Sequence, residues 1–180
     1  MTSLFPTQAQ VLSNASIYGD PRGRDRTKMS TAWERDNIVY IPTPFRMTYA
    51  GQPVTRIRVH KACAGSLLRV LNNLLDAARL INAKRPQMVL DLWGVSVFGG
   101  VVNYRLMRDG NSLSIHSYGA AIDLDPANNG LYDKTPRFAA FPEVLRAFQK
   151  EGWTWGGDWD GDGSTADERR PDGMHWQATR

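Results

Sequence analysis

The sequence SIHSYGAAID occupies residues 114–123, and a shorter stretch, DGMHW, occupies residues 172–176. Together they carry two histidines and two aspartates. The step from His116 to Asp123 does not suit a single helix, because seven residues span roughly 10 Å along a helix axis at 1.5 Å per residue. Gly119 permits a tight turn, and the residues that follow it are small and apolar, as expected of a buried strand. We therefore expect a loop and a strand that return Asp123 to the side of His116.

These side chains match the donors that zinc prefers. Zinc binds neutral imidazole nitrogens and carboxylate oxygens at roughly 2.0–2.2 Å, and a catalytic site leaves one of its four positions to water. His116, Asp123 and His175 would supply the three protein ligands of one Zn²⁺ ion. Asp172 would act as a general base toward a water molecule and then as an acid toward a leaving amine. A purely structural zinc is the alternative, but such sites favour four cysteine or histidine ligands.

The same residues carry a resemblance to a known family. The pattern Ser-x-His-x-x-Gly-x-Ala-x-Asp, followed at a distance by Asp or Glu-x-x-His, resembles the D-alanyl-D-alanine carboxypeptidase and L-alanyl-D-glutamate endopeptidase family of zinc peptidases. That family includes vancomycin-resistance carboxypeptidases and many phage endolysins. The fixed positions are met here by Ser114, His116, Gly119, Ala121, Asp123, Asp172 and His175. The resemblance is strong from about Pro86 to Trp176.

The resemblance implies further roles. Arg105 would stabilise the oxyanion of the tetrahedral intermediate, with Arg108 as a competitor, and Ser114 would bind substrate or orient the loop backbone. Many relatives have Glu where this chain has Asp172, so the arm of the base is shorter here. The implied substrate is a peptidoglycan stem peptide, cut at the L-alanyl-D-glutamate bond as by a phage endolysin. The alternatives are a D-alanyl-D-alanine carboxypeptidase and a catalytically inactive wall-binding module, although neither a ligand nor the base is missing.

Length and composition limit the remaining possibilities. A chain of 180 residues is expected to form one domain, residues 1–180, with a substantial core. The net charge of +4 suits an anionic partner such as the bacterial wall, and no nucleic-acid-binding motif appears. Cys63 is the only cysteine, which excludes an intramolecular disulfide. The first residues do not resemble a signal peptide, and no apolar stretch predicts membrane insertion. We expect a monomer made in the host cytoplasm that reaches the wall by another route, such as a phage holin.

Hydrophobic patterns predict an α+β fold: a small, mainly antiparallel sheet with flanking helices, and the zinc in a cleft on the sheet. Helices are expected over residues 62–83 and from Pro142 to Gly152, where proline suits the first turn. Residues 1–60 include an irregular, basic N-terminal arm, most of which lies in residues 13–36. The expected strands are residues 38–41, 54–59, 88–93, 120–124, 153–155 and 175–177.

An acidic loop precedes the last histidine. From Asp158, acidic residues stand at positions 1, 3 and 5 and glycine at position 6, which is the opening pattern of an EF-hand calcium loop. Position 12 is Arg169, so calcium would need a modified site, and a solvated acidic loop is the alternative. If calcium binds, it would order the segment that delivers Asp172 and His175. The residues of this candidate calcium site are Asp158, Asp160, Asp162, Ser164, Asp167 and Glu168.

Overall fold

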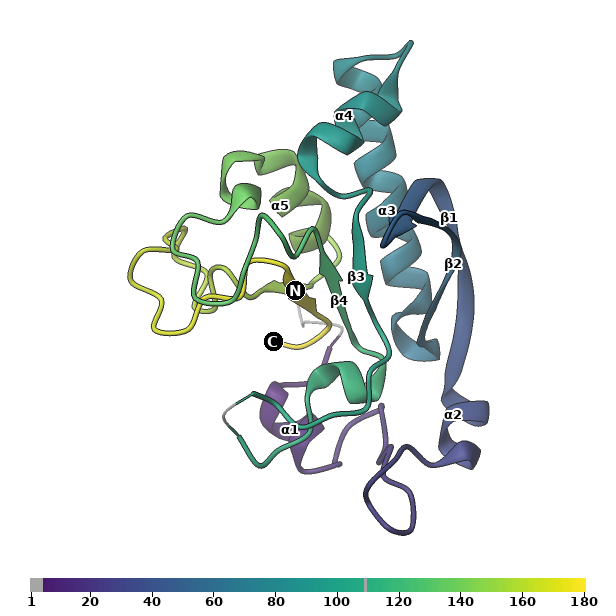
Figure 1. Cartoon of the computed structure of the whole chain (residues 1–180). Helices are drawn as coiled ribbons and strands as arrows, with labels where there is room; N and C mark the ends of the chain where they lie inside the picture. The colour runs from purple at the N-terminus through teal and green to yellow at the C-terminus, as the bar shows by residue number, and fades with distance from the viewer. Residues whose placement is uncertain (1–4, 109) are drawn as a thin grey trace.

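The computed structural model describes residues 5–108 and 110–180, which form a mixed α/β fold with two small antiparallel sheets (Figure 1). One sheet is a hairpin of β1 (Ile38–Tyr49) and β2 (Gln52–His60). The prediction of a single sheet was therefore wrong, because the hairpin closes on itself, from the Ile38–His60 pair to the Tyr49–Gln52 pair. The other sheet has the order β3 (Phe98–Gly100), β4 (Ala121–Leu124), β6 (His175–Gln177) and β5 (Thr154–Trp155).

The two helices expected from the sequence are confirmed. α3 (Lys61–Ile81) buries one stripe of leucines, packs on β1, and runs alongside the hairpin in Figure 1. α5 (Pro142–Gln149) begins at its proline and packs on α3 and β5. The remaining helical segments are α1 (Gln8–Leu12), α2 (Thr31–Asn37), α4 (Pro86–Trp93), and the 3₁₀ turns η1 (Ile115–Tyr118) and η2 (Arg137–Ala140).

The strand expected at residues 88–93 is instead part of helix α4. A short apolar run fits a buried strand or a buried helix, and periodicity alone does not separate the two. The helix forms because Pro86 stands in its first turn and Gly94 ends it with a left-handed φ of 87°. Its buried residues, Val89, Leu90 and Trp93, then lie on one helical face.

Two further expectations about the N-terminal third need correction. The strand expected at residues 38–41 continues to Tyr49, through Pro42 and Pro44, with a register shift between Pro42 and Met47. Proline is tolerated there because β1 is an edge strand of a two-stranded sheet. Residues 13–36 are not wholly irregular either, since α2 begins at Thr31 with Ser30 as its N-cap.

Strand β6 separates the core from the candidate site. Trp176 is fully buried, and its ring stacks on Phe148 with ring centroids 4.0 Å apart and on Trp155 at 5.5 Å. Since successive side chains of a strand point to opposite faces, His175 and Gln177 face away from this aromatic stack. The site is therefore built on a rigid, well-packed strand.

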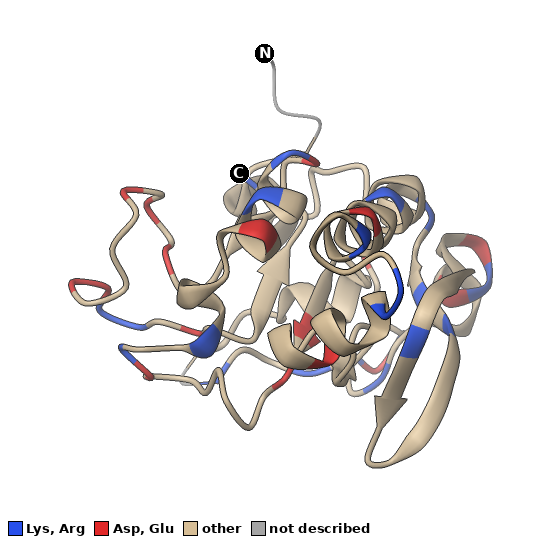
Figure 2. Ribbon diagram, turned by 90° about the horizontal axis from the view of Figure 1, so that it is seen from above, with Lys and Arg blue, Asp and Glu red and all other residues tan. Residues whose placement is uncertain are grey.

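The described residues form no helix that combines the length and apolar character needed to cross a bilayer. Basic and acidic residues are interspersed over most of the ribbon, as Figure 2 shows.

Candidate metal centre and active-site cleft

Three donor atoms converge at the open face of the four-stranded sheet. His116 Nε2, Asp123 Oδ1 and His175 Nδ1 form a triangle in which each pair of atoms is 3.1 Å apart. A tetrahedral zinc site with ligands at about 2.0–2.1 Å spaces its donors roughly 3.3 Å apart. The two histidines are buried, and the group could hold a metal ion. The structure thus brings together the three residues predicted as ligands.

The other ring nitrogen of each histidine sets the chemistry of this triangle. His116 Nδ1 lies 2.8 Å from the carbonyl oxygen of Val101, and His175 Nε2 lies 3.1 Å from Gln177 Oε1. Both partners are acceptors, so these nitrogens carry the protons when the rings are neutral. The nitrogens that face Asp123 are then lone pairs. Two lone pairs and a carboxylate at such short distances would repel one another, and a cation between them would relieve that repulsion. The two imidazole nitrogens and the carboxylate oxygen are also a donor set that zinc accepts.

Local structure places each donor. Ser114 caps η1, accepting a hydrogen bond from the backbone N–H of His116, and Gly119 ends the turn with a φ of 65°. A side chain at Gly119 would also meet Ile38 Cδ1 at 2.8 Å. Asp123 in β4 lies directly opposite His175 in β6. The expected loop is therefore a 3₁₀ turn followed by a strand.

The charges of the site perturb one another. Burial alone would raise the pKa of Asp123. When the facing nitrogens of His116 and His175 carry protons in place of a metal ion, their hydrogen bonds hold the pKa of Asp123 well below its usual range. Burial would lower the pKa of His175, but the hydrogen bond to Asp123 and the charge of that carboxylate raise it. Burial, and secondarily the charge of Asp123, raises the pKa of Asp172. Its Oδ1 is buried and has no hydrogen-bond partner among the described residues.

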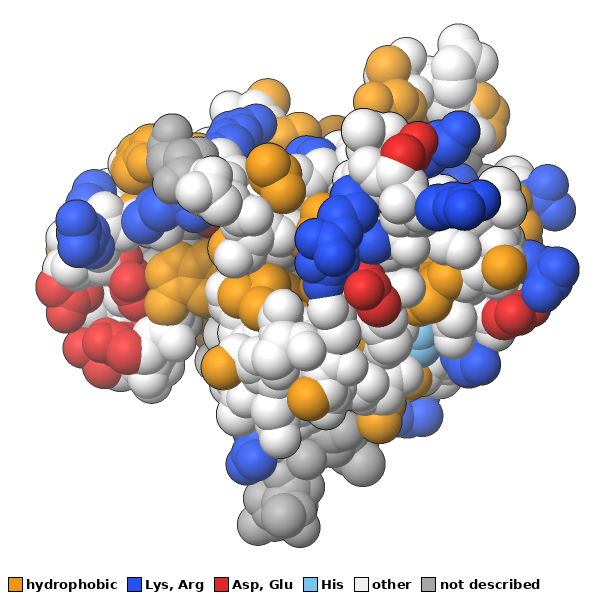
Figure 3. Space-filling view, turned by 90° about the horizontal axis from the view of Figure 1, so that it is seen from below, with side chains coloured by type: hydrophobic (Ala, Val, Ile, Leu, Met, Phe, Trp, Pro, Cys, Tyr) orange, Lys and Arg blue, Asp and Glu red, His pale blue; other side chains and the backbone are white. Residues whose placement is uncertain are grey.

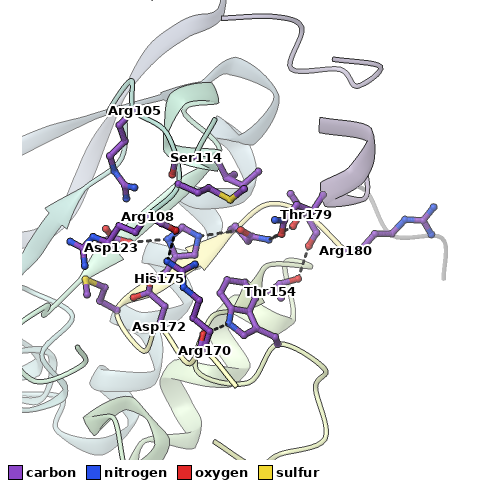
Figure 4. A pocket seen from close by; sticks show the side chains of 16 residues that line it. Arg105, Arg108, Ser114, Asp123, Thr154, Arg170, Asp172, His175, Thr179 and Arg180 are labelled. Atoms are coloured by element: carbon purple, nitrogen blue, oxygen red, sulfur yellow. Dashed lines mark hydrogen bonds and ion pairs between the residues drawn. The ribbon is translucent and has the colours of Figure 1, made fainter. Parts of the chain in front are cut away.

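These groups open onto a cavity of about 390 Å³ (Figure 4). Asp123, Asp172 and His175 line it together with cationic and aromatic side chains. The charge of Arg108 acts on Asp172, lowering its pKa in opposition to burial. The additional side chains that give the cavity its cationic and aromatic character are Arg105, Arg108, Arg170, Arg180 and Trp159.

Residues 108–178 match the family model described as D-alanyl-D-alanine carboxypeptidase. The match covers less than half of the 180 residues and shows that this segment is similar to that family. The family resemblance drawn from the sequence motifs is thereby confirmed, and all three donors and Asp172 lie within the matched segment. No curated protein and no solved structure matches the chain.

Two further residues predicted from the sequence, Arg105 and Ser114, line the cavity. Arg105 lines the cavity, and its Nη1 donates to the carbonyl of Leu106 at 3.3 Å. Ser114 also lines the cavity while its oxygen caps η1, so a backbone-orienting role has a direct geometric basis. Their roles in catalysis stay predictions.

Sequence reasoning missed the groups that orient the histidines. Gln177 stands two residues after His175, which puts both side chains on the same face of β6. That spacing was a usable signal. The Val101 carbonyl gave none, because a backbone acceptor has no sequence signature. Arg170, which donates to the carbonyl of Arg108 at 3.1 Å, was also missed.

The acidic loop does not support calcium. Carboxylates of Asp158, Asp160 and Asp162 lie together, but the two aspartates that follow Asp158 are exposed, and Asp158 accepts backbone N–H groups of residues 161–163. Glu168, expected to help close the site, instead accepts the backbone N–H groups of Trp159 and Asp160. Figure 3 shows acidic side chains gathered at the left edge of the molecule, where the loop lies in Figure 1. Carboxylates of Asp158 and Glu168 are thus hydrogen-bonded to backbone N–H groups of the loop itself.

Proposed function

We propose that the protein is a zinc-dependent peptidase of peptidoglycan stem peptides, cutting the L-alanyl-D-glutamate bond in the manner of a phage endolysin. The observation that carries the zinc peptidase assignment is the triangle of His116, Asp123 and His175, whose lone pairs converge within a segment similar to the carboxypeptidase family. The choice of bond rests on the resemblance to phage endolysins.

Residues of the cleft would each have a separate role in hydrolysis of the peptide bond. His116, Asp123 and His175 hold the zinc ion, which when bound lowers the pKa of water to about 7 and polarises the scissile carbonyl. Asp172 takes a proton from the attacking water. As the C–N bond breaks, the same carboxyl group gives that proton to the leaving amine. The raised pKa of Asp172 favours this second step, because a carboxyl group that binds its proton more tightly stays available as an acid.

Arginine would stabilise the oxyanion that develops on the carbonyl oxygen. A preorganised donor of this kind typically lowers the barrier by about 2.7–4 kcal/mol. Arg105 is the residue implied by the family resemblance. Arg108 is supported by its electrostatic action on Asp172. Arg105→Ala and Arg108→Ala variants, compared side by side, distinguish these two candidates. The variant that lacks the oxyanion-stabilising arginine should lose most of its kcat with little change in zinc content.

A D-alanyl-D-alanine carboxypeptidase is the second candidate, favoured by the description of the matching family model. Mass spectrometry of digested peptidoglycan decides between them. Stem peptides beginning at D-glutamate would support the endopeptidase, whereas loss of a terminal D-alanine would support the carboxypeptidase. Both products should disappear with a chelator and return with zinc. Failure of the zinc-loaded protein to release either product would refute the proposal. Release to the wall through a holin stays a separate prediction.

A further inference from the structure

A second cavity, of about 410 Å³, lies between the β1–β2 hairpin and strand β3. We call it the hairpin groove. It is lined by aromatic rings, by cationic and amide side chains, and by Gly99 and Gly100. The side chains used in the argument below are Tyr40, Tyr49, Arg56, Arg58, Phe98 and Asn103.

The aromatic rings of the groove face solvent. Tyr40 is 54% exposed and Tyr49 is 56% exposed. Arg56 lies over the Tyr40 ring at 4.5 Å, and Tyr49 meets Phe98 edge-on with ring centroids 6.4 Å apart. A half-exposed tyrosine presents both an apolar ring face and a hydroxyl group to a ligand.

The polar side chains that line the groove are cationic or amide groups. Its lining includes Arg56, Arg58 and Asn103 and, among the described residues, no carboxylate side chain. Residues 38–60, which form the hairpin, contain three arginines and no acidic residue. Glu34, from helix α2, forms an ion pair with Arg58. The groove therefore offers hydrogen-bond donors beside flat apolar rings, which suits a ligand that is rich in oxygen acceptors and has apolar ring faces.

The groove lies next to the candidate active site, on the far side of strand β3. Gly100 pairs with Asp123 across the β3–β4 ladder, and neighbouring strands lie about 4.8 Å apart. A Cβ atom at Gly99 would lie 2.9 Å from that of Asp123. Asn103 donates its backbone N–H to the carbonyl of His116 at 3.1 Å. A substrate bound at the donor triangle could thus reach the groove by crossing one strand.

We propose that the hairpin groove binds the amino-sugar chain of peptidoglycan, with pyranose rings on Tyr40 and Tyr49 and sugar oxygens on Arg56 and Asn103. This inference rests on the proposed function. It also agrees with the bond that we propose is cut. If the L-alanyl-D-glutamate bond is cleaved, L-alanine is the single residue between the muramic acid and the scissile bond. An extended residue spans about 3.3–3.6 Å, so the sugar would lie close to the cleft.

Binding is tested without catalysis, by NMR titration of the zinc-loaded protein with glycan strands from which the stem peptides have been removed. Shifts should concentrate on residues of the hairpin groove. Tyr40→Ala should weaken binding about tenfold, Tyr40→Phe should retain most of it, and Arg79→Ala on the distant face of α3 should change nothing. Absence of glycan binding by the wild-type protein, or equal binding by Tyr40→Ala, would overturn the inference.

A kinetic comparison adds a second readout. Tyr40→Ala should raise KM about tenfold for a disaccharide-linked stem peptide and leave kcat/KM unchanged for the free stem peptide. Equal losses on both substrates would assign the groove to the peptide and overturn the glycan inference. If the wild-type protein cleaves neither substrate but still binds glycan strands at the groove, the proposed function fails while the groove assignment stands.

Discussion

Gln177 is expected to control zinc affinity without touching the metal. Its Oε1 accepts a hydrogen bond from His175 Nε2 at 3.1 Å, and its amide nitrogen is in turn held by Gln8 Oε1 at 3.0 Å and Thr179 Oγ1 at 2.6 Å. In Gln177→Leu, the buried N–H of His175 loses its acceptor. A buried donor without a partner costs about 1–3 kcal/mol. Replacing such a partner typically lowers metal affinity by about 10- to 100-fold, and we expect a loss in that range.

Competition with a chromophoric zinc chelator at neutral pH measures this loss, and thermal unfolding of the metal-free variants checks that each is folded. Gln177→Glu keeps an acceptor toward His175 and should restore the affinity to at least the wild-type value. Thr179→Val removes only the hydrogen bond to the amide nitrogen and should have a much smaller effect. A folded Gln177→Leu protein that binds zinc within twofold of the wild type would refute the reasoning.

Three further outcomes are expected. The Asp172→Asn variant should keep its zinc and lose about 10²–10⁴-fold in kcat. Because the pKa of Asp172 is raised, the acidic limb of the wild-type kcat/KM profile should lie above pH 3.8. A limb below that value would contradict the assignment of Asp172 as the base. Burial, aided by the charge of Lys61, lowers the pKa of His60 from 6.5 to about 4, so the unfolded chain binds this proton first as the pH falls. The control is His60→Asn, whose side chain can still cap α3. Between pH 7 and pH 4 the wild type should lose about 3 kcal/mol more unfolding free energy than this variant. Denaturant titrations that show the same pH dependence of the unfolding free energy for both proteins would exclude this effect. In Gly99→Ala, the new Cβ atom would lie 2.9 Å from the Cβ atom of Asp123. This substitution should lower the unfolding free energy by about 1–3 kcal/mol and weaken zinc binding. The control Gly130→Ala adds a Cβ atom with no neighbour within 4 Å and should change neither quantity.

The sequence predicted the donor triangle because the residue types and their order carry the chemistry directly. Two histidines and an aspartate around a glycine turn and a small-residue strand leave few other arrangements. The apolar run at residues 88–93 was ambiguous, because only its proline and glycine boundaries distinguish a helix from a strand. The pairing of β1 and β2 into a separate sheet, and the contact of the Val101 carbonyl with His116, depend on tertiary packing that no local pattern encodes.

The donors of the triangle come from two parts of the chain, since His116 and Asp123 are seven residues apart and His175 follows Asp123 by another 52. Synthesis therefore delivers two of them together and the third much later, with the strand that also supplies Gln177. A chain that ends anywhere between residues 124 and 174 holds two donors and lacks His175 altogether. The complete set of three donors can therefore form only after β6 has been made and has paired with β4.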